Sequence, residues 1–165
     1  MTQAMAAVAE ARLWIGTPYV HQAATRGAGT DCLGLLRGVW GALYGAEPEP
    51  VPAYTEDWAE PGHNEALWHA ARRWLIEVKG VAPALRGDVA LRGGVALRED
   101  VAQGDVLLFR MRTGAIAKHL GIVSAVGADA KFIHAYTGHG VIESPLSAPW
   151  LRKVAARFEF PTGVR

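Results

Sequence analysis

The sequence predicts an α+β domain in which helices come first and an antiparallel sheet follows. Apolar residues recur at steps of three and four through the first half of the chain, the spacing of helices that pack on a core. The second half changes to short runs rich in β-branched and aromatic residues, separated by Gly, Asp or Pro, which is typical of consecutive strands. No linker interrupts the 165 residues, so we expect one domain over 1–165.

Two helices are expected in the first 45 residues. Thr2 can cap the first, whose apolar positions extend to Trp14 before Gly16–Pro18 breaks the pattern. The stretch 21–30 is rich in Gly, Ala and Thr and is expected to be a loop. A second helix is predicted over Asp31–Tyr44, where a glycine follows directly and ends it.

The middle of the chain is less regular. A third helix is predicted over Pro61–Lys79, with its apolar residues on one side. Residues 80–104 contain the near-repeat Val-Ala-Leu-Arg around Gly93 and Gly94, which suits either a small hairpin or an irregular surface insertion. The expected strands are Val106–Arg110, His119–Val126, Lys131–Tyr136, Val141–Glu143 and Lys153–Phe160.

Composition excludes several classes of function. The formal net charge is +1 and the basic residues are dispersed, so direct nucleic-acid binding is not expected. No run approaches the roughly 20 apolar residues of a membrane-spanning helix. The first 14 residues lack the basic segment and apolar run of a signal peptide, so we expect a protein made in the cytoplasm.

Cys32 is the only cysteine, and it lies at the predicted start of the second helix. Unpaired backbone N–H groups and the positive end of the helix dipole at that position favour a thiolate over a thiol. A thiolate can act as a nucleophile when a base lies nearby. The alternative is that Cys32 is a small buried residue facing the core.

Two histidines could supply the base. His119 opens one predicted strand and His134 lies in the next, with a tight turn near Gly127 between them, so the strands are expected to pair antiparallel. A nucleophile at a helix start, a base on a strand and an orienting group on the neighbouring strand form the logic of a catalytic triad. The alternative is that both histidines are hydrogen-bonded core residues.

The other histidines carry less weight. His63 and His69 lie on or beside the predicted third helix and are expected to be solvated, while His21 and His139 lie in loops. No two of these residues have the close spacing of metal ligands on one helix. We therefore expect no metal and no other cofactor.

Five short motifs follow one another along the chain: Gly16–Tyr19 (GTPY), Asp31–Leu35 (DCLGL), Gln103–Val106 (QGDV), Lys118–Val123 (KHLGIV) and Phe132–His134 (FIH). In this order they resemble the motifs of the NlpC-type cell-wall peptidases. The motifs around Cys32 and His119 are each modestly specific, but their order and separation make a strong combination, and the match runs from about residue 10 to the end of the chain. More narrowly, Tyr19–Gln22, Phe132–Gly138 and the ending Phe158–Pro161 resemble the branch of phage and gene-transfer-agent cell-wall peptidases.

The resemblance implies a papain-like fold, with the nucleophile at a helix N-terminus packed on a C-terminal antiparallel sheet. It implies that Cys32 attacks the amide carbonyl, that His119 is the base and that His134 orients His119. Tyr19 and Asp31 would contact the substrate or the oxyanion. The substrate would be a peptidoglycan stem peptide, usually cut between D-glutamate and diaminopimelate.

Two departures from the family pattern affect the expected substrate details. Leu33 follows the cysteine where a serine is common, and His21-Gln22 replaces a frequent Gly-Gly. Two other functions remain open from the sequence. One is a thiol amidase or acyltransferase, and the other is a non-catalytic adaptor in a tail tip.

The narrower resemblance also implies a location and partners. The protein would be incorporated into the tail of a phage-like particle, in contact with hub or baseplate proteins. It would act on the recipient's wall in the periplasm and so aid DNA entry.

Overall fold

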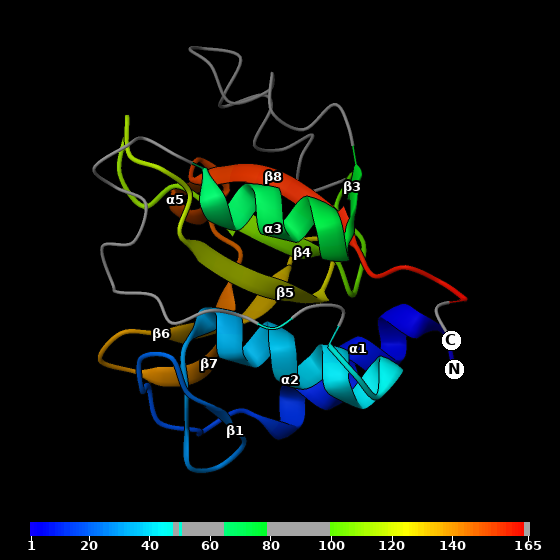
Figure 1. The fold of residues 1–165 in the computed structure, drawn as a ribbon. Coiled ribbons are helices and arrows are strands. Elements are labelled where there is room, and N and C mark those ends of the chain that lie inside the picture. The colour runs from blue at the N-terminus through cyan, green and yellow to red at the C-terminus, as the bar shows by residue number, and fades with distance from the viewer. Residues whose placement is uncertain (48–49, 51–64, 79–99, 164–165) are drawn as a thin grey trace.

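The chain is described by a computed structural model that leaves out residues 48–49, 51–64, 79–99 and 164–165. In the described part, the helices are α1 (Gln3–Leu13), α2 (Cys32–Tyr44), α3 (Ala66–Trp74) and α5 (Ala148–Leu151). The strands are β1 (Ala24–Thr25), β2 (Gly29–Thr30), β3 (Ile76–Val78), β4 (Val106–Phe109), β5 (His119–Ala125), β6 (Lys131–Tyr136), β7 (Gly140–Pro145) and β8 (Val154–Glu159). N-terminal helices thus precede a C-terminal antiparallel sheet, and the predicted α+β class is confirmed (Figure 1).

The first two helices begin and end where their sequence signals lie. The Thr2 hydroxyl accepts a hydrogen bond from the Met5 N–H at 3.2 Å, as an N-cap does. Asp31 caps α2 in the same way, and Gly45, with φ of 84°, ends it. Glycine adopts this left-handed conformation without the clash that a Cβ would cause.

The main sheet has six strands in the order β3-β8-β4-β5-β6-β7. Strands β4 to β7 form an antiparallel meander, and β8 returns to pair with β4 on its other side. The β5–β6 pairing aligns Ile122 with Ile133, and Gly127 turns between the strands with φ of 89°. The predicted pairing of the two histidine-bearing strands is therefore confirmed.

The third predicted helix is wrong at its C-terminal end. Helix α3 stops at Trp74, and Ile76–Val78 forms an edge strand that pairs antiparallel with β8. Pairing with β8 satisfies the backbone groups that a further helical turn would have bonded, and β-branched Ile76 and Val78 favour the extended form. Of the predicted range, 61–64 and 79 lie outside the described residues.

Two smaller expectations also need correction. The segment 21–30 is not only loop, because β1 and β2 pair within it as a short hairpin. Helix α5, which the sequence analysis did not predict, covers part of the sheet. The possible hairpin around Gly93 and Gly94 lies outside the described residues.

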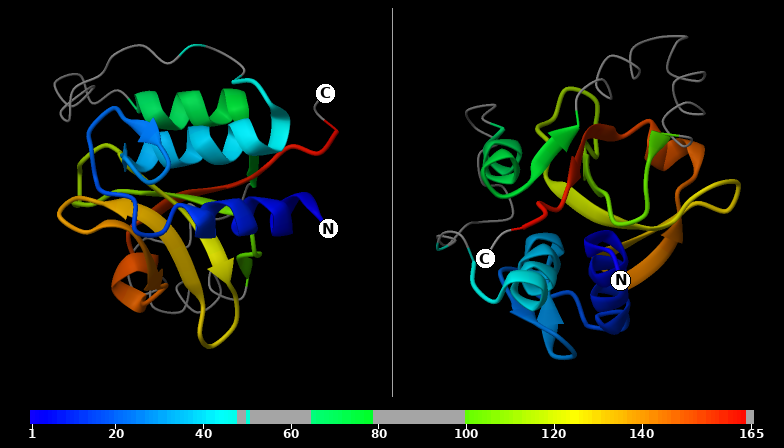
Figure 2. Two further views of the ribbon diagram at one scale, coloured as in Figure 1. Left: turned by 90° about the horizontal axis from the view of Figure 1, so that it is seen from below. Right: turned by 90° about the vertical axis from the view of Figure 1, so that its right-hand side faces the viewer.

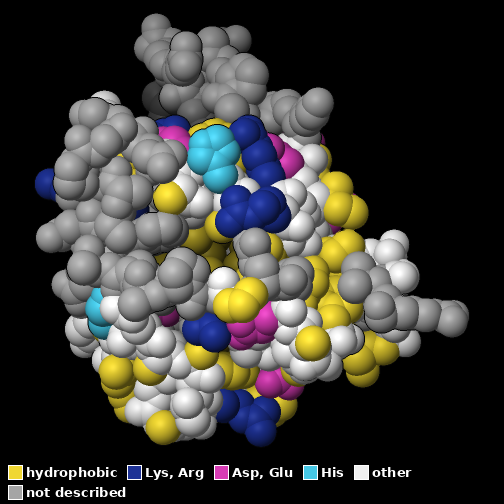
Figure 3. Space-filling view, in the orientation of Figure 1, with side chains coloured by type: hydrophobic (Ala, Val, Ile, Leu, Met, Phe, Trp, Pro, Cys, Tyr) yellow, Lys and Arg dark blue, Asp and Glu magenta, His cyan; other side chains and the backbone are white. Residues whose placement is uncertain are grey.

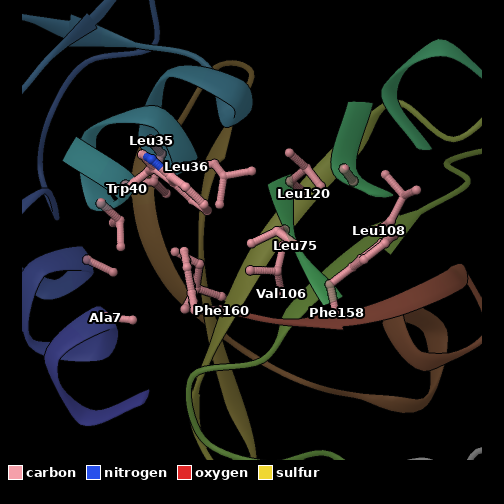
Figure 4. Close-up of a cluster of buried hydrophobic side chains, with 14 of the residues drawn as sticks. Ala7, Leu35, Leu36, Trp40, Leu75, Val106, Leu108, Leu120, Phe158 and Phe160 are labelled. Atoms are coloured by element: carbon pink, nitrogen blue, oxygen red, sulfur yellow. The ribbon is translucent and has the colours of Figure 1, made fainter. Parts of the chain in front are cut away.

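Each face of the sheet buries its own cluster of apolar side chains. Helices α1, α2 and α3 cover one face, where Val39, Leu108 and Phe158 are fully buried (Figures 2 and 4). Helix α5 lies on the opposite side, over a cluster that includes Phe109 and Phe132. The alternation of side chains along each strand sends neighbouring residues to opposite clusters.

The described residues on the face seen in Figure 3 show no dominant charge. On the face seen in Figure 3, Lys and Arg side chains are interspersed with Asp and Glu side chains, in keeping with a net charge of +1. No helix in the described ranges is long and apolar enough to cross a membrane.

Candidate active site

Asp31 fixes the point at which α2 begins. Its Oδ1 accepts a hydrogen bond from the Gly34 N–H at 2.7 Å, and its Oδ2 accepts one from the Gln22 N–H at 2.8 Å. The residue is only 2% exposed. Asp31 therefore holds the preceding loop and the first turn of α2 together, and the next residue, Cys32, is placed by that contact.

The loop packs closely enough against α2 to require specific residues. A Cβ on Gly34 would lie 2.0 Å from the Ala23 carbonyl oxygen, which is backbone and cannot yield. Gln22 has a φ of 62°, which is uncommon for a residue with a side chain. His21 lies beside it, with Nδ1 3.8 Å from Asp31 Oδ2.

The Cys32 thiol lies against the backbone of β5. Its Sγ donates a hydrogen bond to the Lys118 carbonyl oxygen at 3.5 Å, and the Leu120 N–H also interacts with it. These two residues flank His119 in the chain. The structure therefore brings the start of α2 to the start of β5, although the two segments are far apart in the sequence.

His119 and His134 are hydrogen-bonded to each other. His119 Nε2 lies 2.7 Å from His134 Nδ1, and the ring centroids are 5.0 Å apart. The second nitrogen of His134, Nε2, lies 2.8 Å from the Ser144 hydroxyl on β7. Hydrogen bonds thus link His119 on β5 to His134 on β6 and to Ser144 on β7, and the Cys32 thiol lies against the backbone beside His119.

Aromatic rings enclose the histidine pair. Trp150 of α5 lies with its ring centroid 5.8 Å from that of His119 and 5.1 Å from that of His134. Phe109 packs on His119, and Phe132 packs on His134 at 4.2 Å. As a result His134 is fully buried and His119 is 8% exposed.

Burial keeps both histidines neutral. Desolvation first, then the neighbouring His134 and Lys153, lowers the pKa of His119 to about 3. Desolvation and His139 lower the pKa of His134 to about 4. With one N–H and one lone pair on each ring, the pair can share a single hydrogen bond.

The thiolate expected from the helix start is corrected by the structure. Burial first, and then the negative charge of Asp31, raises the pKa of Cys32 to about 12. Backbone N–H groups of Leu120 and Leu33 act in the opposite direction but are outweighed. Without substrate, the site therefore holds a thiol and neutral imidazoles.

The remaining predicted residues take different places. Tyr19 forms a bridge with Thr30 and is partly buried against the same cluster as Cys32. The ring of His139 stacks on Tyr136 at 5.2 Å, while His69 is exposed and His63 lies outside the described residues. Among the described residues, no group of three or more His, Cys, Asp or Glu is arranged to hold a metal.

Two neighbours of the site were missed in the sequence. Ser144 lies between Glu143 and Pro145, where a polar residue suggests only a solvated strand end. Trp150 follows the Ser-Ala-Pro sequence at 147–149, which is a helix-start signal too short to reveal what the tryptophan covers.

Comparison with known proteins places the fold. The sequence model of the NlpC/P60 family matches residues 16–158. An NlpC/P60 family protein from Bacillus cereus is similar with a TM-score of 0.57 at 16% identity, over 95% of this chain and 40% of the other. The NlpC/p60 domain of the peptidoglycan hydrolase SagA gives 0.52 at 23% identity, over 97% of this chain and 100% of that domain.

A third structure, NlpC1 from Trichomonas vaginalis, gives a TM-score of 0.53 at 18% identity, over 95% of this chain and 44% of its own. The chain thus spans less than half the length of two of these three proteins. At such low identities the likeness establishes the shared fold. No curated protein matches the sequence.

Proposed function

The chain belongs to the NlpC/P60 family, and from this premise we propose that it is a cysteine peptidase that cleaves peptide bonds in peptidoglycan. One observation carries the proposal. The thiol of Cys32, at the start of α2, lies against the backbone that flanks His119, and the His119 ring is hydrogen-bonded to His134. These contacts support the assignment of Cys32 as nucleophile, His119 as base and His134 as orienting group.

The neutral state of the site defines the first chemical step. His119 takes the proton from Cys32 Sγ as the sulfur attacks the carbonyl carbon of the scissile amide, so the charged pair forms only when substrate is present. The tetrahedral oxyanion then needs hydrogen-bond donors. We assign this role to the Cys32 backbone N–H, which has no carbonyl partner within α2, with help from Tyr19.

Collapse of that intermediate completes the first half of the reaction. The C–N bond breaks, His119 returns its proton to the leaving amine, and an acyl-thioester remains on Cys32. His119 then takes a proton from a water molecule as the water attacks the thioester. The C–S bond breaks, and the proton returns to sulfur.

We also propose a specific bond in peptidoglycan, which family membership alone does not determine. We assign the cleaved bond to the link between D-glutamate and diaminopimelate in a stem peptide, on the resemblance of the ordered motifs. The similar SagA domain is that of a peptidoglycan hydrolase. This likeness supports peptidoglycan as the substrate, but it does not bear on which bond is cleaved. Since both Asp31 oxygens accept backbone hydrogen bonds, we assign Asp31 to placing Cys32.

The narrower resemblance supports a further part of the proposal. The protein would travel in the tail of a phage-like particle, bound to hub or baseplate proteins, and open the recipient's wall in the periplasm for DNA entry. Fractionation tests this part directly. The protein should co-sediment with tail-containing particles, and recovery only in the particle-free fraction would contradict it.

Digestion of purified Gram-negative peptidoglycan tests the chemistry. Wild-type protein should release fragments with new termini at D-glutamate–diaminopimelate bonds, identified by mass spectrometry. Cys32→Ala should lose this activity completely while keeping its thermal unfolding midpoint, because only the sulfur is removed from a partly buried position.

Other outcomes point to other functions. Equal digestion by wild-type and Cys32→Ala protein would exclude the thiol mechanism. Intact peptidoglycan with both folded proteins would favour the tail-tip adaptor. If added amines formed conjugates faster than water released product, the chain would be an acyltransferase.

A further inference from the structure

We propose that Ser144 is a positioning residue that permits the tautomers of His134 and His119 in which His119 can act as a base. This inference rests on the proposed function for its catalytic meaning. The tautomers themselves can be observed without any substrate. Ser144 does not touch the reacting atoms and acts only through His134.

The register of the sheet brings Ser144 to His134. Strands β6 and β7 pair Phe132 with Ser144 and His134 with Ile142, so Ser144 is the diagonal neighbour of His134 on the same face. The imidazole is long enough to span that diagonal, and its Nε2 lies 2.8 Å from Ser144 Oγ. His134 is fully buried, so the serine supplies the polar contact that water would supply at an exposed ring.

Only two arrangements of protons satisfy the 2.7 Å contact between His119 Nε2 and His134 Nδ1 when both rings are neutral. In the first, His119 Nε2–H donates to His134 Nδ1, and His119 Nδ1 keeps a lone pair that can accept the thiol proton. His134 must then carry its own proton on Nε2 and donate it to Ser144 Oγ. In the second, every donor and acceptor is reversed, and His119 Nδ1 already holds a proton.

The serine oxygen makes the first arrangement possible at low cost. Without it, the first arrangement would leave a buried N–H at His134 Nε2 with no acceptor, whereas the second would leave only a buried lone pair. Orphaned N–H groups are the rarer of the two in folded proteins, and an unmet buried donor is expensive. Loss of the Ser144 oxygen should therefore shift both rings to the second arrangement, in which His119 cannot accept a proton.

Nuclear magnetic resonance of ¹⁵N-labelled histidine reads the tautomers directly at pH 7.5. Wild-type protein should show His119 and His134 both protonated on Nε2. Ser144→Ala should move both rings toward protonation on Nδ1, while Ser144→Thr, which keeps the hydroxyl, should restore the wild-type pattern. Ser124→Ala is the matched control, because Ser124 is also a strand serine with a hydrogen-bonded hydroxyl, at 2.6 Å from Glu143, but does not contact either histidine.

Kinetics supply a second readout. Ser144→Ala should lower kcat about 5- to 100-fold with little change in KM, the range that corresponds to one unmet buried hydrogen bond. Alkylation by iodoacetamide, which reports on Cys32 alone in a chain with one cysteine, should slow in the same variant. Ser144→Thr should recover both rates, and Ser124→Ala should leave both at wild-type values.

The tautomer measurement tests the role of Ser144, and peptidoglycan digestion tests the proposed function, so the two can fail separately. Protonation of His119 on Nδ1 in the wild-type protein, or unchanged tautomers in Ser144→Ala, would overturn the role of Ser144 whatever the substrate is. If the tautomers shift as expected but wild-type protein leaves peptidoglycan intact, the tautomer control stands and the peptidase assignment fails.

Discussion

The two faces of the six-stranded sheet use the same strands for different purposes. On the face covered by α1, α2 and α3, residues such as Leu108 and Ile133 contribute to a large apolar cluster. On the face covered by α5, the neighbouring residues Phe109 and His134 belong to or border a smaller aromatic cluster. Burial of apolar side chains stabilises the first face. On the second face, part of that stabilisation is offset by the cost of removing the polar histidine rings from water.

The difference shows how a short sequence motif can carry a site. In His119–Ile122, the histidine and Gly121 face the aromatic cluster, while Leu120 and Ile122 are buried in the helix-covered one. A Cβ on Gly121 would lie 2.6 Å from the Phe132 ring, so the glycine makes room for the packing around His134. Each residue of the motif therefore has a place on one of the two faces.

The largest effects are expected from a matched pair of substitutions, one on each face of the sheet. Leu107 and Leu108 are both fully buried, but they belong to opposite clusters. Leu108→Ala and Leu107→Ala should each lower the free energy of unfolding by about 2–5 kcal/mol, because both lose the same buried volume. Urea denaturation measures this loss.

Activity per folded molecule should then differ between the two variants. Leu107→Ala loosens the cluster of Phe109 and Phe132, which pack on the histidines, so kcat should fall several-fold. Leu108→Ala should lower kcat less when assayed well below its unfolding temperature, because Leu108 belongs to the cluster under Cys32 rather than to the aromatic cluster around the two histidines. Equal kcat values in the two variants would remove the functional distinction between the faces.

The next largest effect is that of acid, which should lower the free energy of unfolding through the two histidines of the aromatic face. The folded-state pKa values of His119 and His134, about 3 and about 4, lie below the ordinary value of 6.5. Between those values the two histidines are protonated in the unfolded chain but neutral in the folded one. Their contribution to stability is complete above pH 6.5 and is lost as the pH falls toward 4. Asp105 acts oppositely, because burial raises its pKa to about 6.

On unfolding, His119 and His134 each take up a proton and Asp105 releases one, so the net uptake is about one proton. The free energy of unfolding should therefore rise by about 1.4 kcal/mol per pH unit between pH 4 and 6. Unfolding by urea at a series of pH values measures the slope. His134→Gln should flatten it, because one of the two histidines is gone. An equally steep slope in that variant would show that other groups govern the acid sensitivity.

The smallest expected effect concerns the start of α2. The Asp31 charge raises the pKa of Cys32, second only to burial, so Asp31→Asn should lower that pKa and speed alkylation at any pH below it. Asparagine keeps one oxygen for the Gly34 N–H and so preserves the cap, whereas the hydrogen bond from the Gln22 N–H is lost. Slower alkylation, with the fold intact, would contradict the assigned electrostatic effect.

Local signals predicted much of this molecule. Thr2, Asp31 and Gly45 mark helix ends through their own side chains or backbone freedom, and the structure confirms all three. The strand that carries His134 was predicted with its bounds, because alternation and turn residues agree there. These features depend on interactions within a few residues.

What the sequence did not predict depends on distant partners. Ile76–Val78 is a strand only because β8 lies beside it. The expected thiolate at Cys32 followed from the helix start alone, but burial and Asp31 have the larger effect on the pKa. Ser144 became relevant only through the register of β6 and β7, which no local pattern encodes.

The outer strand β7 has one more consequence, for the behaviour of the protein in concentrated solution. Its first residues do not present open backbone groups, because Gly16 N–H donates to the Val141 carbonyl and Val141 N–H donates to the Thr17 carbonyl, at 3.0 and 2.9 Å. Gly140, with φ of 76°, permits this close approach. The chain's own N-terminal segment thus occupies positions where a strand of a second molecule could add, which protects this end of the sheet against edge-to-edge aggregation.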